Sequence, residues 1–306
     1  MRLLHGQDTV VDSSLKETSA HGTEAFPFAV YLDDFSCFKN DSIIWHWHDE
    51  AQLTYIIEGE FSCHVGSEKM HMGPGDIIFI NAQALHQIIP ARRAEGKLYS
   101  FLWKPELLGP SEGDLYQNCV SPLLLSPLRH ILFPAEQALS RRLSASLRLI
   151  VRAMTEKFSL RELHVSTQLG LIWLKICEQA QSSPYPSRET LAQLHSRERE
   201  EQRVKEAMAF IEGHYPEKLS LDAIAKAAMT NRSELCRSFR HVLDMSPGDY
   251  LMQHRLSRSL SLLEDPELRI ADIAELCGFC SPSHFGSNFL KYLGCSPLQY
   301  RRQSLD

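Results

Sequence analysis

The sequence predicts an α+β multidomain protein, with an N-terminal β-barrel and helical extension followed by an all-α C-terminal domain of two helix-turn-helix units. Three observations predict this class. Short β-rich runs broken by turn residues occupy positions 28–103. Helical periodicity replaces them after Pro134. A repeat with an offset of about 50 residues then appears in the C-terminal third.

Length and composition agree with a globular protein of more than one domain. The chain has 306 residues, of which 43% are hydrophobic and 23% charged. Its apolar runs are short, for example at 77–80 and 171–174, well below the roughly 20 residues that cross a bilayer. The first residues do not have the pattern of a secretory signal. We therefore expect no membrane partner and a cytoplasmic location.

The N-terminal third of the sequence predicts closely spaced strands. The runs are 28–32, 43–45, 52–57, 77–80 and 99–103. The intervening segments Glu58-Gly59-Glu60 and Gly73-Pro74-Gly75-Asp76 suit tight turns. Short strands separated by such turns favour a small barrel or sandwich.

Two amphipathic helices should follow the strands. Apolar residues recur at three- and four-residue steps over 139–154, and the pattern continues in a second helix over 163–176. A stretch rich in Pro and Ser then leads into a dense run of charges at 197–201. We expect a barrel over 1–134, a helical segment over 135–182, a linker over 183–200 and the double helix-turn-helix domain over 201–306.

The C-terminal domain contains an internal repeat. The pairs with matching residues are Ile224-Ala225 with Ile273-Ala274, 49 positions apart, and Phe239 with Phe289, Ser246-Pro247 with Ser296-Pro297 and Tyr250 with Tyr300, each 50 apart. Two copies are too few for a solenoid, which needs at least three to bury a continuous core. A duplicated helix-turn-helix explains them better.

The turn is clearest in the second copy. Gly278 stands where a left-handed cap should end the first helix, and Ser281 with Pro282 suits the start of the next. Cys277 and Cys280 have the spacing of a redox or zinc pair, which is the alternative interpretation. Because no second pair accompanies them, we expect Cys277 in the core and Cys280 in the turn.

These positions resemble a known family. The matching residues are Ile273-Ala274, Gly278-Phe279, His284-Phe285, Phe289, Gly294, Ser296-Pro297 and Tyr300-Arg301, with Arg255-Leu256 in the preceding linker helix. They are similar to the C-terminal signature of the AraC/XylS family of transcriptional regulators, over about the last hundred residues. The resemblance implies that each unit places its second helix in a major groove of double-stranded DNA.

The resemblance also implies which side chains contact DNA. On the first reading helix, 231–241, Arg237 is the expected base reader, since a guanidinium can bond both acceptors of guanine. Phosphate contacts are expected from Arg232, Arg240, Arg255 and Arg258. The other outward candidates are Ser233 and Cys236 in the first unit and Pro282, Ser283, Ser287 and Asn288 in the second.

The alternative for each arginine is a solvated helix face. The net charge is −6, and the segment from Arg197 onward has 15 basic and 16 acidic residues, so the domain is not basic overall. In the second unit, Ser287 and Leu290 stand where the family commonly has a basic residue. In the first unit, Asp244 replaces the glycine that the second unit keeps as Gly294. The second unit is therefore expected to read DNA weakly, or by shape.

The N-terminal domain resembles the cupin fold. The run from His46 and His48 to Gln52, followed by Gly59, Gly75 and His86, is similar to its two β-barrel motifs. In metal-binding cupins these positions supply two histidines, a glutamate and a third histidine, which suit divalent iron, manganese or zinc. Here Gln52 stands in the place of the glutamate.

We therefore expect His46, His48, Gln52 and His86 to line an effector pocket in the barrel. A divalent metal held by the three histidines is one alternative, and histidines that are merely packed are another. The predicted function is a sequence-specific transcriptional regulator that binds a small-molecule effector, such as a sugar or related metabolite, and acts as a homodimer through the barrel or the helices at 136–180. The other hypotheses are a metal-dependent cupin enzyme with a helical appendage and a protein-binding module.

Overall fold

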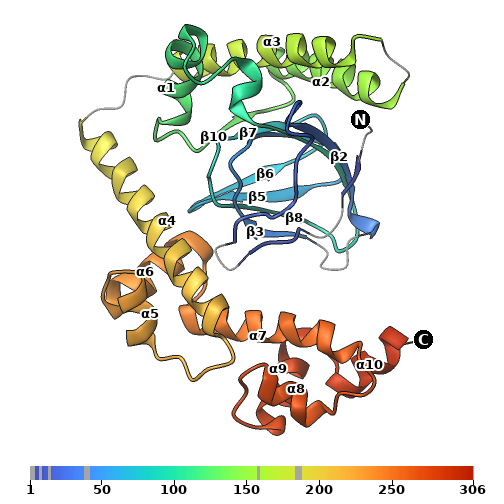
Figure 1. Ribbon diagram of the computed structural model, residues 1–306, viewed down its shortest axis with the longest axis vertical. Helices are drawn as coiled ribbons and strands as arrows, with labels where there is room; N and C mark the ends of the chain where they lie inside the picture. The colour runs from blue at the N-terminus through green and yellow to red at the C-terminus, as the bar shows by residue number, and fades with distance from the viewer. Residues whose placement is uncertain are drawn as a thin grey trace. The chain divides into compact units, whose positions relative to one another are not determined.

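The computed structural model describes residues 4–6, 9–12, 15–37, 42–156, 159–182 and 188–305. The chain forms two compact units, 1–198 and 199–306 (Figure 1). Among the residues described, every strand lies in the first unit, and the second unit is helical. The predicted α+β class, with strands before helices, is thus confirmed.

The first unit is built on two sheets. The larger has the order β1 (Leu4–His5), β2 (Phe28–Asp34), β9 (Lys97–Trp103), β4 (Ala51–Glu58), β7 (Ile77–Ile80) and β10 (His130–Phe133). The smaller has the order β3 (Ile43–His46), β8 (His86–Pro90), β5 (Phe61–Val65) and β6 (Glu68–Met72). Neighbouring strands are antiparallel, apart from the parallel pair β1 and β2. The prediction of a barrel is corrected, because the strand pairs of the described residues form two separate sheets.

Alternation along the strands gives the larger sheet two buried faces. Ile56 and Ile78 pack between the sheets against Phe61 of the smaller sheet. The opposite face, with Leu53 and Phe79, is covered by helices.

The covering helices are α2 (Ala138–Thr155) and α3 (Arg161–Ser182), and the short α1 (Ser121–Leu124) lies beside them (Figure 1). Leu143, Leu147 and Ile150 of α2 and Trp173 of α3 are buried against the sheet. The two amphipathic helices predicted from the spacing of apolar residues are therefore confirmed.

Only part of the predicted linker, 183–200, lies in the described part of the chain. Residues 183–187 lie outside the described part of the chain. Residues 188–200 form the first half of helix α4 (Arg188–His214). The domain boundaries proposed from the sequence stay a prediction. No helix in the described part of the chain is both long and apolar enough to cross a bilayer.

The second unit consists of short helices around one long central helix. After α4 come α5 (Leu221–Ala227), α6 (Arg232–Leu243), α7 (Pro247–Leu263), α8 (Ile270–Leu276), α9 (Pro282–Leu293) and α10 (Pro297–Leu305). The pairs α5–α6 and α8–α9 are the two helix-turn-helix units, and α7 joins them (Figure 1).

The two turns have the same hydrogen bonds, so the sequence repeat is a structural repeat. The Thr230 N–H donates to the Ala225 carbonyl at 2.9 Å, and the Phe279 N–H donates to the Ala274 carbonyl at 2.9 Å. Each bond spans five residues and closes over a left-handed residue, as in a Schellman cap. That residue is Met229 in the first copy and Gly278 in the second.

The helix ends also follow the prediction. The Ser281 side chain accepts a hydrogen bond from the His284 N–H at 3.1 Å, and Pro282 begins α9. Cys277 is fully buried and Cys280 is exposed, as the structural interpretation of this pair predicts.

Candidate functional site

Helix α6 presents a basic face to solvent. Asn231 caps its start by accepting from the Glu234 N–H at 3.0 Å. Leu235 and Phe239 are fully buried, which fixes the orientation of the helix. The opposite face carries the predicted DNA-contacting residues: Arg232, Ser233, Arg237 and Arg240 are exposed and Cys236 is half-buried.

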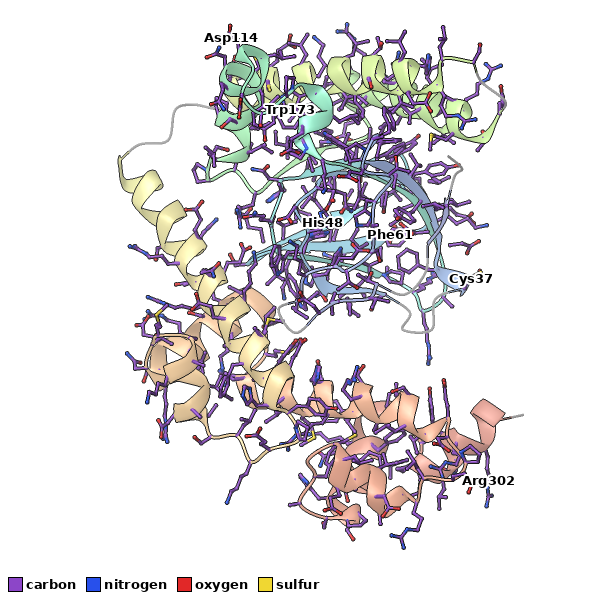
Figure 2. The ribbon with its side chains drawn as sticks, in the orientation of Figure 1. Cys37, His48, Phe61, Asp114, Trp173 and Arg302 are labelled. Atoms are coloured by element: carbon purple, nitrogen blue, oxygen red, sulfur yellow. The ribbon has the colours of Figure 1, made fainter. Side chains whose placement is uncertain are left out.

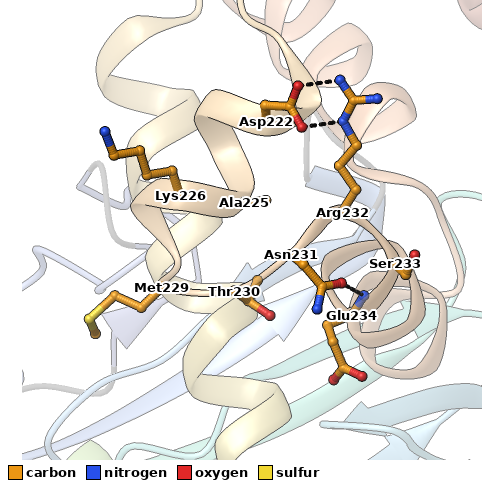
Figure 3. A pocket seen from close by; sticks show the side chains of 9 residues that line it. All are labelled: Asp222, Ala225, Lys226, Met229, Thr230, Asn231, Arg232, Ser233 and Glu234. Atoms are coloured by element: carbon orange, nitrogen blue, oxygen red, sulfur yellow. Dashed lines mark hydrogen bonds and ion pairs between the residues drawn. The ribbon is translucent and has the colours of Figure 1, made fainter.

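Two of these arginines are held by carboxylates. Arg232 makes a two-point ion pair with Asp222 of α5 (Figure 3). Arg237 donates to Glu234 at 2.6 Å. The Arg237 side chain is still 65% exposed, so its guanidinium can exchange this partner for another acceptor. Exposed ion pairs of this kind are screened by solvent and salt, so they hold the arginines weakly.

A shallow hollow lies at the turn between α5 and α6. Figure 3 shows the side chains around it: Asp222, Ala225, Lys226, Met229, Thr230, Asn231, Arg232, Ser233 and Glu234. Its lining includes the cations Lys226 and Arg232 and the carboxylates Asp222 and Glu234, so the hollow carries no net positive charge.

The prediction that Arg255 contacts phosphate is wrong, because its side chain is buried. It is only 9% exposed, and its guanidinium donates to the carbonyls of Tyr215 and Glu217, both at 2.8 Å. These bonds connect α7 to the loop after α4, so Arg255 is a structural residue. Arg258, one turn further along α7, is exposed and lies 6.0 Å from the Tyr215 ring centroid.

Helix α9 offers a different surface. Pro282, Ser283 and Ser287 are exposed, while the Asn288 side chain is half-buried and donates to the His284 carbonyl at 2.8 Å. Leu290 is 54% exposed on the same helix. The helix therefore presents small, polar and apolar groups where α6 presents arginines.

The four predicted pocket residues come together between the two sheets. His46 on β3 is the register partner of His86 on β8, and their ring centroids are 4.1 Å apart. Gln52 reaches them from β4 of the opposite sheet, and His48 lies two residues after the end of β3. All four are buried, and Figure 2 labels His48 within this region.

The three rings are held by the same kind of hydrogen bond. Nδ1 of His46, His48 and His86 donates to the carbonyls of Ile44, Glu50 and Ala84, at 2.8, 3.0 and 2.8 Å. Burial lowers the pKa of His46 to about 4 and also lowers the pKa of His48, so these two rings are neutral at pH 7. A neutral ring with a proton on Nδ1 has a lone pair on Nε2.

Gln52 completes this cluster. Its Oε1 position lies 2.8 Å from His48 Nε2 and 3.2 Å from His86 Nε2, and its other amide atom lies 2.9 Å from the Thr54 hydroxyl. With neutral rings, the amide satisfies both Nε2 atoms when its NH₂ group faces them and its carbonyl accepts from Thr54. With a cation between the rings, the carbonyl can face the cation instead.

This donor set fits a divalent transition metal. The ligand atoms of the three histidines lie within 4.8 Å of one another, and each Nδ1 is already held by a carbonyl, as is usual for histidines that bind metals. His46, His48 and His86 would hold such an ion, with Gln52 as a neutral oxygen donor. Imidazole nitrogens suit zinc, iron, copper and nickel.

The sequence did not reveal Glu17. Its Oε2 lies 3.9 Å from His46 Nε2 and 3.2 Å from His21 Nε2, so it reaches the same cluster from the N-terminal segment. Burial would raise the pKa of the Glu17 carboxyl, but the hydrogen bond to His21 and the interaction with His46 lower it to about 2. Glu17 is therefore a buried carboxylate at pH 7.

An exposed basic reading helix in a duplicated helix-turn-helix, together with a separate unit that encloses a polar cluster, defines a DNA-binding regulator with a ligand-binding domain. Residues 35–171 match the description "AraC-like ligand binding domain", and residues 224–303 match "Helix-turn-helix domain". The HTH-type transcriptional regulator YdeC of Bacillus subtilis is 30% identical over 299 residues, which are 96% of this chain and 98% of that protein.

Two further proteins are similar over most of the chain. The melibiose operon regulatory protein of Escherichia coli is 24% identical over 265 residues, 85% of this chain and 83% of that protein. The solved structure of ToxT from Vibrio cholerae is 14% identical, covers 83% of this chain and 90% of its own, and has a TM-score of 0.37. The chain belongs to the AraC family of helix-turn-helix transcriptional regulators.

Proposed function

We propose that this protein is a homodimeric, sequence-specific transcriptional regulator whose effector, a sugar or related metabolite, binds between the two sheets of the first unit. The observation that carries the proposal is the pair of matching helix-turn-helix units, the first with an exposed arginine face. Family membership favours this function over the cupin enzyme considered as the alternative. Action on DNA agrees with the expected cytoplasmic location, which stays a prediction.

Base reading is assigned to α6. Arg237 is in the middle of the exposed face, where its guanidinium can reach both acceptors of a guanine. Arg232 lies five residues before Arg237 and Arg240 three residues after it, and both suit phosphates, as does Arg258 of α7. Ser233 and Cys236 line the same face.

Helix α9 is assigned a weaker role. Pro282, Ser283, Ser287 and Asn288 can contact bases or sugars, but they carry no charge. Contacts of this kind depend on the shape of the groove more than on phosphate charge. Most of the sequence preference should therefore come from the half-site under α6.

The effector is assigned to the polar cluster of His46, His48, Gln52 and His86. Buried hydrogen-bonding groups that converge from two sheets suit a polar molecule such as a sugar. One relative carries the name of a melibiose operon regulator, which supports a sugar as the first class to test.

The dimer is assigned to α3. Leu163, Leu171 and Leu174 are 63%, 52% and 51% exposed and fall on one face of this helix, and the intervening Gly170 has open space beside it. Burying these leucines against a second copy would stabilise a twofold pair. Light scattering should show that Leu171→Glu shifts the protein toward the monomer.

The test of the function is DNA binding by the full chain. Fluorescence anisotropy should show preferential binding to the region upstream of its own operon, weakened by about 1–3 kcal/mol in Arg237→Ala. Arg152→Ala is the matched control, since Arg152 is also an exposed arginine paired with a glutamate, on α2. Equal binding to unrelated DNA, or equal effects of both variants, would contradict the proposal.

A further inference from the structure

Glu234 lies at the centre of a network of three charges in the second unit. Its Oε1 accepts a hydrogen bond from Nη2 of Arg237 at 2.6 Å, and its Oε2 accepts one from Nη1 of Arg203 on α4 at 3.2 Å. Each carboxylate oxygen therefore has an arginine partner of its own. The backbone is also fixed at this point, because the Glu234 N–H donates to the side chain of Asn231, which caps α6.

The three side chains are exposed to different degrees. The side chain of Arg237 is 65% exposed, whereas those of Glu234 and Arg203 are 30% and 32% exposed. Arg237 is therefore the member of the network that DNA can reach best. An isolated exposed pair would be weak, but a carboxylate that is bound by arginines from two helices has fewer positions open to it.

A second polar contact holds α4 against α6. Glu200 Oε2 lies 2.5 Å from Nδ1 of His241, near the end of α6. Glu200 and Arg203 are three residues apart on α4 and thus share one face of that helix. Their partners Glu234 and His241 are seven residues apart, which is about two turns of α6. Arg203 is therefore fixed relative to the reading helix by a contact other than its own.

The corresponding positions of the second helix-turn-helix unit cannot form this network. With the offset of 50 residues, Glu234 corresponds to His284 and Arg237 corresponds to Ser287. Neither position offers a carboxylate or a guanidinium. The network is thus a feature of the unit to which base reading is assigned.

Reading a base with arginine requires a guanidinium in a defined position. Arg237 uses one N–H group for Glu234 and keeps the others for the two acceptors of guanine. A long side chain loses rotamer freedom when it binds, and this cost is smaller where a neighbour already restricts the side chain. Because the cost arises only where the arginine meets its base, a restricted Arg237 should prefer that base more strongly.

We propose that Glu234 is a positioning residue that holds Arg237 for base reading, and that Arg203 fixes the carboxylate from α4. The inference rests on the proposed function, in which Arg237 reads guanine. Glu234 increases the preference for that guanine and, because its charge repels phosphates, lowers the affinity for unrelated DNA. A merely structural role would not change these two quantities in opposite directions.

The experiment measures base preference with the full-length chain. Each variant is incubated with a pool of duplexes of random sequence, the bound fraction is sequenced, and the preference for guanine is determined at each position. Arg237→Ala identifies the position that this arginine reads. We expect Glu234→Gln to lower the guanine preference there by about 2- to 10-fold, which corresponds to the cost of ordering one long side chain. Preferences at the other positions should not change.

Two further measurements on Glu234→Gln separate positioning from stability. Fluorescence anisotropy at low salt should show severalfold tighter binding to an unrelated duplex, because a negative charge has been removed. In the Arg237→Ala background, Glu234→Gln should change the preference at the same position no further, since Glu234 acts through Arg237.

Two other variants complete the design. Glu206→Gln makes the same chemical change at another half-buried glutamate of the second unit, which accepts from Gln202 on α4 at 3.1 Å, and it should behave as the parent does. Arg203→Met removes the charge on α4 and keeps the length of the side chain, so it should lower the same guanine preference by a smaller factor. If Glu234→Gln does not fold, Arg203→Met carries the test.

The outcomes separate the two proposals. Parental guanine preference in Glu234→Gln, an equal loss in Glu206→Gln or weaker binding to the unrelated duplex overturns the positioning role, and parental preference in Arg203→Met overturns the role of α4. Loss of a cytosine preference at another position would show that Glu234 reads a base itself, which also overturns the inference. Absence of any base preference in the parent would refute the proposed function. A preference that Arg237→Ala loses and Glu234→Gln keeps would refute this inference alone.

Discussion

Replacing Gly278 by alanine should strongly destabilise the second unit. Gly278 has φ +75°, and a Cβ atom there would lie 2.6 Å from the Tyr215 carbonyl oxygen and 2.7 Å from that of Pro216. The left-handed backbone costs a non-glycine residue about 1–2 kcal/mol. Overpacking against backbone atoms adds about 1–3 kcal/mol, so the expected loss is about 2–5 kcal/mol.

Gly294→Ala is the matched control. Gly294 also has φ +75°, but a Cβ atom there would meet nothing within 4 Å, so only the backbone contribution of about 1–2 kcal/mol is expected. The difference between the two variants measures the contact with the loop at 215–216.

The chain contains a reporter that separates the two units. Its four tryptophans are Trp45, Trp47, Trp103 and Trp173, all in the first unit. In urea, Gly278→Ala should move the helical transition seen by circular dichroism and leave the tryptophan fluorescence transition unchanged. Equal losses in the Gly278 and Gly294 variants would refute the steric argument.

Three further outcomes are expected. Met229 holds the left-handed position of the first turn with φ 48°, so Met229→Gly should stabilise the second unit by about 0.5–1 kcal/mol in the same urea assay, and a loss would contradict the repeat argument. Burial raises the pKa of Asp33 to about 7, above its ordinary value of 3.8, so the folded chain keeps a proton that the unfolded chain releases. Stability should therefore fall as pH rises from about 4 to 7, and Asp33→Asn should abolish this slope and stabilise the first unit above pH 7 by up to about 4 kcal/mol, as read by tryptophan fluorescence. Asp222→Asn should free Arg232 and strengthen binding to unrelated DNA roughly severalfold at low salt in the anisotropy assay, and an unchanged affinity would show that this ion pair does not compete with phosphate.

Local signals predicted the helices of the second unit well. The turn glycine, the Ser281 cap and Pro282 act within a few residues, so the end of α8 and the start of α9 follow from the sequence to within one or two positions. The prediction of the strands was less complete. Strand β7 was predicted with its observed ends, whereas β6, with its exposed and polar residues, was missed because it lacks the apolar pattern of a buried strand.

The ligand cluster was predictable only in part. His46, His48, Gln52 and His86 belong to motifs that the sequence shows, and the structure brings them together. Glu17 has no motif around it. It arrives through pairing of residues 15–17 with Trp47, about thirty positions away, and single-sequence periodicity contains no information on such long-range pairing.

Arg255 helps to position the two reading helices. Its guanidinium bonds the loop at 215–217, and Gly278 packs against the same loop, so α7 and the second turn meet at one joint. Two helices that read adjacent major grooves must lie about one turn of DNA apart, which this joint helps to fix. Changes at the joint should therefore weaken DNA binding without altering its salt dependence, because no phosphate contact is lost. Changes at Arg232 or Arg240 should reduce the salt slope, because each removes a charge that displaces counterions from DNA.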